Sequence, residues 1–103
     1  MNRLGKVAIA GTGQVGTMIG SALMAAGTKA GISSVGLFDV KPEVAEVALG
    51  LGAGDMVLTD PESVLSGDVV ILAMPVGEII AWLARFGPGL RRDQLLLDTG
   101  SAK

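Results

Sequence analysis

The chain has 103 residues, half of them apolar, and a formal net charge of −2, which together predict one domain with an aliphatic core. It contains no cysteine and no histidine, which excludes disulfide bonds and thiolate chemistry, removes the commonest general base and leaves no predicted metal site. Basic residues form no cluster, and the longest apolar run, "VVILAMPV", is too short to span a bilayer, so we expect a cytoplasmic protein that binds neither nucleic acid nor membrane.

The first part of the chain predicts a strand, a helix and a second strand. Residues 6–11, "KVAIAG", form a short apolar run that ends in glycine, which is typical of a buried strand. Residues 14–27 carry apolar side chains at helical spacing, and Gly27 can end this helix as its C-cap. A loop over residues 28–34 then leads to the expected second strand at residues 35–39, "VGLFD".

The middle of the chain repeats this alternation. A proline in the first turn favours a helix over residues 41–52, and "DMVLT" predicts a short third strand at residues 55–59. Asp60 is the expected N-cap of one or two helical turns within residues 60–67. The apolar stretch "DVVILAMP", residues 68–75, predicts the fourth strand.

A further helix and strand complete the pattern. The helix is expected around residues 78–86, and "QLLLDTG", residues 94–100, predicts a fifth strand that is buried because of its three leucines. Five alternations of strand and helix predict an α/β fold with a doubly wound parallel sheet, Rossmann-like, of strand order 3-2-1-4-5 with helices on both faces. No repeat or linker divides the chain, so residues 1–103 are expected to form one dinucleotide-binding domain.

The turn after the first predicted strand carries a glycine pattern, Gly11-x-Gly13-x-x-Gly16, between that strand and a predicted helix. In this position Gly11 permits the tight turn, Gly13 lets a pyrophosphate approach the backbone, and Gly16 lets helix and strand pack closely. The free N–H groups at the helix start would then face the phosphates. The alternative is a plain tight junction without a ligand. The expected cofactor-binding residues of the loop are Gly11, Thr12, Gly13, Gln14, Val15 and Gly16.

The second predicted strand ends in Asp39, about where the fingerprint requires an acid that accepts hydrogen bonds from the adenosine ribose. Its carboxylate would also repel the 2′-phosphate of NADP, by about 1 kcal/mol in water at about 4 Å and by about 4 at an effective dielectric of 20. We therefore predict NAD as the cofactor and NADP as the less favoured one, although Lys41 could reach a phosphate. Val40 is expected beside the cofactor as well. The alternative role for Asp39 is to cap the next helix.

A doubly wound sheet binds its ligand over the carboxyl ends of the strands at the point where the strand order reverses, between strands one and four. The segment "AMPV" ends the fourth predicted strand, so Ala73, Met74 and Pro75 should flank the cofactor. A strand end stopped by proline would explain this segment without a cofactor. The neighbouring fifth strand would deliver "DTGSAK" toward the nicotinamide end.

Taken together, these segments resemble the N-terminal NAD-binding domain of the prephenate and arogenate dehydrogenases of tyrosine biosynthesis. The parallels are "VAIAGTGQVGTMIGSAL", "VGLFDVKPE", "GAGD", "SGDVVILAMPV" and "LLLDTGSAK", which cover nearly all of the chain in the family's order. The glycine pattern is shared by many dehydrogenases. The ending Asp-x-Gly-Ser-x-Lys after the fifth strand is more specific.

The resemblance implies oxidative decarboxylation of prephenate or arogenate. A hydride passes from the ring carbon that bears the hydroxyl to NAD, a carboxylate leaves as CO2, and the ring becomes aromatic. In the family the serine of the last motif, here Ser101, lies by the substrate hydroxyl and is therefore the expected catalytic residue. Its alternative role is to cap the next helix, and Lys103 is given no role.

This chain departs from the family after that motif, because the family's catalytic histidine and helical domain follow it. That domain makes much of the substrate pocket and most of the homodimer contact, so the chain is expected to be an excised domain or a stand-alone relic without useful turnover. Two other functions stay open. One is the cofactor domain of another two-domain dehydrogenase, of the hydroxyisobutyrate type or an imine reductase. The other is a non-catalytic NAD-sensing regulatory module.

Overall fold

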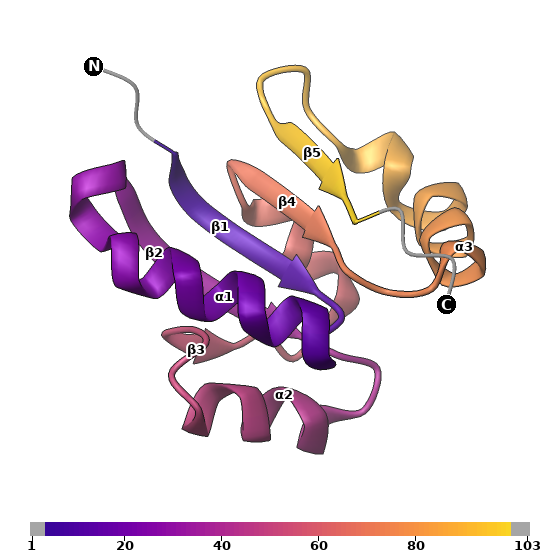
Figure 1. Ribbon diagram of the computed structural model, residues 1–103. Coiled ribbons are helices and arrows are strands. Elements are labelled where there is room, and N and C mark those ends of the chain that lie inside the picture. The colour runs from indigo at the N-terminus through magenta and orange to yellow at the C-terminus, as the bar shows by residue number, and fades with distance from the viewer. Residues whose placement is uncertain (1–3, 100–103) are drawn as a thin grey trace.

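The computed structural model describes residues 4–99, which form one five-stranded sheet with helices packed against it (Figure 1). The strand order is β3-β2-β1-β4-β5, and all neighbouring strands are parallel. The predicted fold class and strand order are therefore confirmed. The strands are β1 (Gly5–Ala10), β2 (Ile32–Phe38), β3 (Met56–Val57), β4 (Val69–Leu72) and β5 (Leu95–Asp98).

Three α-helices and three short 3-10 helices connect the strands. The α-helices form where apolar residues recur at helical spacing, and each lies within about two residues of its predicted start. Gly27 ends the first helix as predicted, with a φ of 51° and its N–H donating to the carbonyl of Leu23. The elements are α1 (Gln14–Ala26), η1 (Gly27–Ala30), α2 (Pro42–Gly50), η2 (Pro61–Ser66), α3 (Val76–Phe86) and η3 (Gly87–Gly89).

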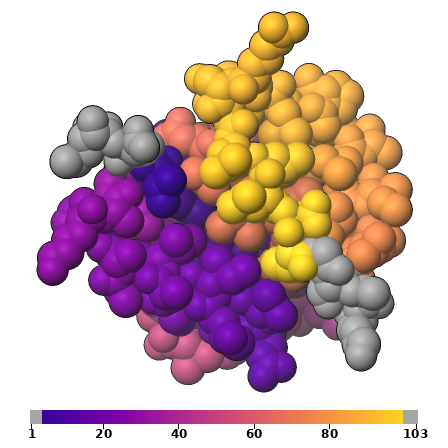
Figure 2. Space-filling view, turned by 45° about the horizontal axis from the view of Figure 1, so that its top comes forward, coloured from indigo at the N-terminus to yellow at the C-terminus, as the bar shows by residue number. Residues whose placement is uncertain are grey.

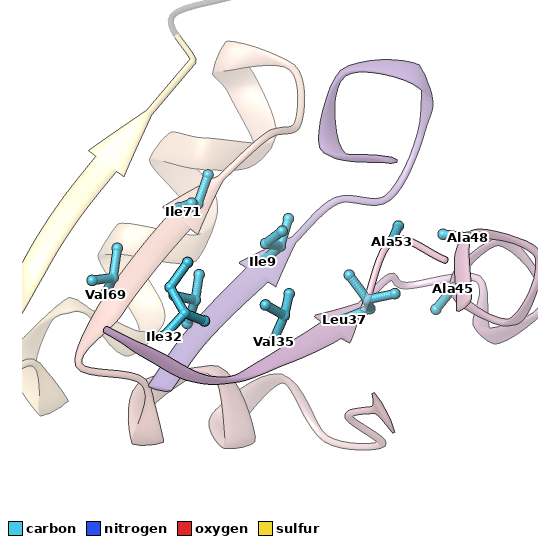
Figure 3. Close-up of a cluster of buried hydrophobic side chains, with 10 residues drawn as sticks. Ile9, Ile32, Val35, Leu37, Ala45, Ala48, Ala53, Val69 and Ile71 are labelled. Atoms are coloured by element: carbon cyan, nitrogen blue, oxygen red, sulfur yellow. The ribbon is translucent and has the colours of Figure 1, made fainter. Parts of the chain in front are cut away.

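The sheet has a separate apolar core on each face, because successive side chains of a strand point to opposite sides. Val7 and Ile9 of β1 lie in the core with α1 and α2, and Figure 3 shows this cluster with Ala45 and Ala48 of α2 facing the sheet. Ala8 and Ala10 lie in the other core, with Val64 of η2 and with Ile79 and Trp82 of α3. Burial on both faces explains why the central strands are apolar without alternation.

The segment predicted as a loop over residues 28–34 is mostly ordered secondary structure. The 3-10 helix η1 ends at Ala30, and its C-cap Gly31 adopts a left-handed conformation with a φ of 75°. This conformation turns the chain directly into β2, which starts at Ile32, three residues earlier than predicted. Ile32 is buried, so its apolar side chain carries the strand into the sheet.

The third strand is shorter than predicted, with two residues in place of five. The carboxylate of Asp55 accepts a hydrogen bond of 2.7 Å from the N–H of Val35, and thereby takes the place of a strand carbonyl. Asp60 does occupy the N-cap position of the next turn, but its side chain makes no capping hydrogen bond, and the turn is a 3-10 helix. The predicted N-cap position of Asp60 is therefore confirmed, but without a side-chain hydrogen bond to the helix.

The fifth strand forms as predicted, but its predicted burial is wrong. Leu95, Leu96 and Leu97 are 49%, 37% and 45% exposed, because β5 is the edge strand and the described helices leave it uncovered. Figure 2 shows its yellow atoms on the surface of the molecule. The three leucines reflect an apolar surface here and not a core. None of the helices within residues 4–99 is long and apolar enough to cross a membrane.

We predict that this chain self-associates at high concentration through the β5 edge. An uncovered strand offers unpaired N–H and C=O groups, and the leucines add apolar area to the contact. Sedimentation velocity should show a rising mean mass as the concentration approaches hundreds of micromolar. The variant Leu97→Lys, which places a charge on an exposed position of the strand, should remain monomeric there. A wild-type chain that stays a clean monomer would contradict the prediction.

Candidate functional site

A cleft lies at the carboxyl ends of β1, β2 and β4, where the strand order reverses. Its volume is about 270 Å³. The chain segments that follow these three strands supply most of its walls, and the first turns of α2 and α3 supply the rest. Seven of the predicted cofactor-binding residues line it, and they are Gly11, Gly13, Asp39, Val40, Ala73, Met74 and Pro75.

Gly11 makes the turn that forms one wall of this cleft. Its φ of +96° is a conformation that side chains disfavour, and a Cβ atom there would lie 2.6 Å from the carbonyl oxygen of Ala73. Its own N–H donates to the carbonyl of Phe38 at 2.8 Å, which ties the turn to the end of β2. Gly11 therefore holds the ends of β1, β2 and β4 together at the cleft.

The other two glycines of the pattern have opposite surroundings. A Cβ atom on Gly16 would overlap the carbonyl oxygen of Gly11, so this position requires glycine for the close packing of α1 on the turn. A Cβ atom on Gly13 would meet nothing within 4 Å. The backbone at Gly13 thus faces open space within the cleft, and a ligand can approach it there.

The first turn of α1 begins at this open position. Gly13 is the N-cap, no side chain caps the helix, and its first turn contains no acidic residue. In contrast, α2 and α3 carry Glu43 and Glu78 in their first turns. Among the α-helices of residues 4–99, α1 is therefore the one whose positive dipole end is not neutralised by a carboxylate in its own first turn.

Asp39 lies beside the turn that leads into α1 and is held by three protein donors. Its Oδ2 accepts hydrogen bonds from the N–H of Thr12 at 2.9 Å and from the hydroxyl of Thr12 at 3.2 Å. Its Oδ1 accepts one from the N–H of Lys41 at 3.0 Å. These bonds fix the carboxylate at the end of β2, beside the glycine turn.

Four of the residues that were predicted to bind the cofactor do not line this cleft. Gly16 is buried against the turn, and Val15 is 43% exposed. Thr12 and Gln14 line a second groove of about 510 Å³ between α1 and α2, which Gly13 also borders. Thr12 is nevertheless connected to the cleft through its hydrogen bonds to Asp39.

The cleft also contains residues that the sequence reasoning did not assign to the cofactor. Phe38, Lys41, Val44 and Glu78 line it. Each stands within a few positions of a strand end already assigned to the site, so counting outward from those strand ends could have found them. The hydrogen bond from Thr12 to Asp39 has no such sequence pattern, because it joins residues from two separate turns.

Ser101, the predicted catalytic residue, lies outside the described residues. The chain before it runs beside the cleft-forming end of β4, where Asp98 pairs with Leu72 and the N–H of Thr99 donates to the Leu72 carbonyl at 3.1 Å. Ala73, which follows Leu72, is already a cleft residue. The end of β5 is thus adjacent to the strand that delivers Ala73, Met74 and Pro75.

Comparisons of the sequence with a family model and with known proteins both point to the prephenate dehydrogenases and their relatives. The family described as prephenate dehydrogenase, nucleotide-binding domain, matches residues 18–103. A cyclohexadienyl dehydrogenase from Zymomonas mobilis is 34% identical over 98 residues, which covers 94% of this chain and 32% of that protein.

Solved structures show the same fold. The prephenate dehydrogenase from A. aeolicus, crystallised with hydroxyphenyl propionate and NAD+, superposes with a TM-score of 0.79 at 28% identity, over 93% of this chain and 33% of that one. The 3-hydroxyisobutyrate dehydrogenase from Mycobacterium tuberculosis gives 0.73 at 29% identity, over 91% and 31%. The chain therefore spans about a third of the length of these relatives. On the strength of the family match over most of its length, this chain belongs to the prephenate dehydrogenase family, in the family's nucleotide-binding domain.

Proposed function

We propose that the chain binds NAD in the cleft at the ends of β1, β2 and β4, as the cofactor domain of a prephenate or arogenate dehydrogenase. The open backbone at Gly13, close to the Asp39 carboxylate that Thr12 holds, is the observation that carries this proposal. A pyrophosphate fits beside Gly13 because no side chain fills that space, and the uncapped start of α1 offers N–H donors to it. The relative from A. aeolicus was crystallised with NAD+.

The remaining residues of the cleft would hold the adenosine half of the cofactor. Asp39 would accept a hydrogen bond from a ribose hydroxyl, and Val40, Ala73, Met74 and Pro75 would supply apolar contact. The bound cofactor would supply the hydride acceptor of the reaction. The side chains described here bind and orient it and do not react.

The reaction of the longer enzyme would be the oxidative decarboxylation of prephenate or arogenate in tyrosine biosynthesis, with Ser101 beside the substrate hydroxyl. The family match and the Asp-x-Gly-Ser-x-Lys ending support this reaction. The substrate would be held mainly by a helical domain that also makes a homodimer, in the cytoplasm. A hydroxyisobutyrate-type dehydrogenase is the second candidate, because such an enzyme has a similar cofactor domain at 29% identity.

We predict that the chain binds NAD at least about fivefold more tightly than NADP, because the Asp39 carboxylate repels a 2′-phosphate by about 1 kcal/mol or more. Calorimetric titration with both cofactors measures this ratio. Asp39→Asn keeps the size of the side chain and removes its charge, so the preference should fall toward one, and Asp39→Ala should do the same. Equal affinities in the wild type, or an unchanged preference in both variants, would contradict the role of Asp39.

We predict that Gly13→Val abolishes NAD binding and leaves the melting temperature nearly unchanged. The φ of Gly13 is −71°, which any residue can adopt, and its added side chain would fill only open space in the cleft. Gly50→Val is the matched control, since Gly50 also faces open space but lies at the far end of α2. Gly16→Ala should instead lower the melting temperature, because its Cβ would overlap the carbonyl of Gly11. Full NAD affinity in Gly13→Val would place the cofactor elsewhere.

We predict that this chain alone binds NAD without oxidising prephenate or arogenate at a useful rate. It contains no histidine, and its nearest acids at that edge are Asp98 on a strand end and Glu78 on a helix start. A general base contributes about 10²–10⁴ in rate, and substrate orientation contributes as much or more. The absorbance of NADH, followed with each substrate at high protein concentration, measures turnover. A rate near about one per second would lie in the range of ordinary enzymes and would contradict the prediction.

A further inference from the structure

Two threonine hydroxyls connect α1, the glycine turn and Asp39 by hydrogen bonds. The hydroxyl of Thr17, in α1, donates to the carbonyl oxygen of Thr12 at 3.0 Å. Thr12 in turn donates from its N–H and its hydroxyl to Oδ2 of Asp39. Thr12 is 2% exposed and is the one buried polar residue within the described part of the chain. A buried threonine is placed here for its hydrogen bonds, since an aliphatic side chain would fill the same space without them.

The bond from Thr17 sets the direction of the peptide between Thr12 and Gly13. A trans peptide is planar, so its C=O and N–H groups point in opposite directions, and residues 4–99 contain no cis peptide. With the Thr12 carbonyl turned toward Thr17, the N–H of Gly13 points away from Thr17. Thr17 borders the groove between α1 and α2, whereas Gly13 borders both that groove and the cleft. The N–H of Gly13 therefore points away from the side of the turn on which Thr17 lies.

This N–H group is available to a ligand. Within residues 4–99 it donates to no backbone or side-chain acceptor. Gly13 also lacks a side chain that could shield it, and the space around its Cβ position is open. The hydroxyl of Thr17 thus holds a free donor toward the place where a phosphate would lie.

Thr12 acts on the second half of the site. An ionised carboxylate has about four lone-pair sites, two on each oxygen. Both sites of Oδ2 of Asp39 are taken by Thr12, and one site of Oδ1 is taken by the N–H of Lys41. One site on Oδ1 is left to accept a hydrogen bond from a ribose hydroxyl. Thr12 thereby fixes which oxygen of Asp39 remains free and in which direction the carboxylate is turned.

We propose that Thr17 and Thr12 are positioning residues for the dinucleotide. Thr17 aims the N–H of Gly13 at the pyrophosphate, and Thr12 orients Asp39 toward the adenosine ribose. This inference rests on the proposed NAD binding and assigns two hydroxyls that do not themselves touch the cofactor. Because each hydroxyl acts on a different part of the dinucleotide, removing one or the other should weaken the binding of a different set of ligands.

The test is a set of NMR titrations with NAD, ADP and adenosine. Thr17→Val removes one hydroxyl at nearly constant side-chain size. It should lower the affinities for NAD and ADP by about 3- to 10-fold, the loss expected for one hydrogen bond. Adenosine, which has no phosphate, should bind this variant within about twofold of the wild type. Thr17→Ser keeps the donor and should restore the affinity for NAD and ADP.

Thr12→Val should lower the affinities for all three ligands, because all contain the ribose. It should also reduce the preference for NAD over NADP. Thr28→Val is the matched control, since Thr28 is an exposed threonine of η1 at the opposite end of the sheet. It should bind every ligand as the wild type does. Melting temperatures are recorded for all variants.

Three outcomes would overturn the inference. Thr17→Val could bind NAD and ADP as well as the wild type. Its affinity for adenosine could also fall by the same factor as its affinity for NAD while its melting temperature falls, which would show a purely structural role. Thr12→Val could keep both its adenosine affinity and its cofactor preference. A wild-type chain that does not bind NAD at all would overturn the proposed function itself, and with it this inference.

Discussion

The close approach of Gly11 to its neighbours is the constraint on which the rest of the structure depends. Its backbone lies between Ala73, at the end of β4, and Gly16, in the first turn of α1, with no room for a side chain at either contact. This packing brings the carboxyl ends of three parallel strands to one point and sets the start of α1 against them. The cleft, the free N–H groups and the position of Asp39 all follow from it.

The same constraint separates the stability of the turn from its ability to bind. Gly11 and Gly16 are needed for packing, whereas Gly13 is needed only for the open space in front of it. Thr12 and Thr17 belong to the interior side of the turn, where their hydroxyls hold the backbone and the Asp39 carboxylate. The turn therefore has an inner side that fixes its geometry and an outer side that faces open space in the cleft.

Much of this arrangement could be predicted from the sequence, because it depends on local patterns. Alternating apolar runs and helical spacing predicted the sheet and its strand order, and the glycine spacing with an acid after the second strand predicted the cleft. The leucine pattern alone could not predict the exposure of Leu95, Leu96 and Leu97, since a strand of leucines looks the same in a core and at an uncovered edge. The bonds between Thr12, Thr17 and Asp39 also escaped prediction, because they depend on how two turns meet in space.

The proposed binding of NAD at the turn after β1 puts its pyrophosphate beside Gly13. The most direct test is to assign the backbone amide signals of the chain by NMR and follow them as NAD is added. We expect the largest shifts at Gly13 and Gln14, with smaller ones at Val40 and Met74, and little change at Ser34 and Ser66 on the opposite end of the sheet. Shifts confined to Met18, Val47 and Leu51, which line the groove between α1 and α2 but not the cleft, or no saturable shifts, would contradict binding at this turn.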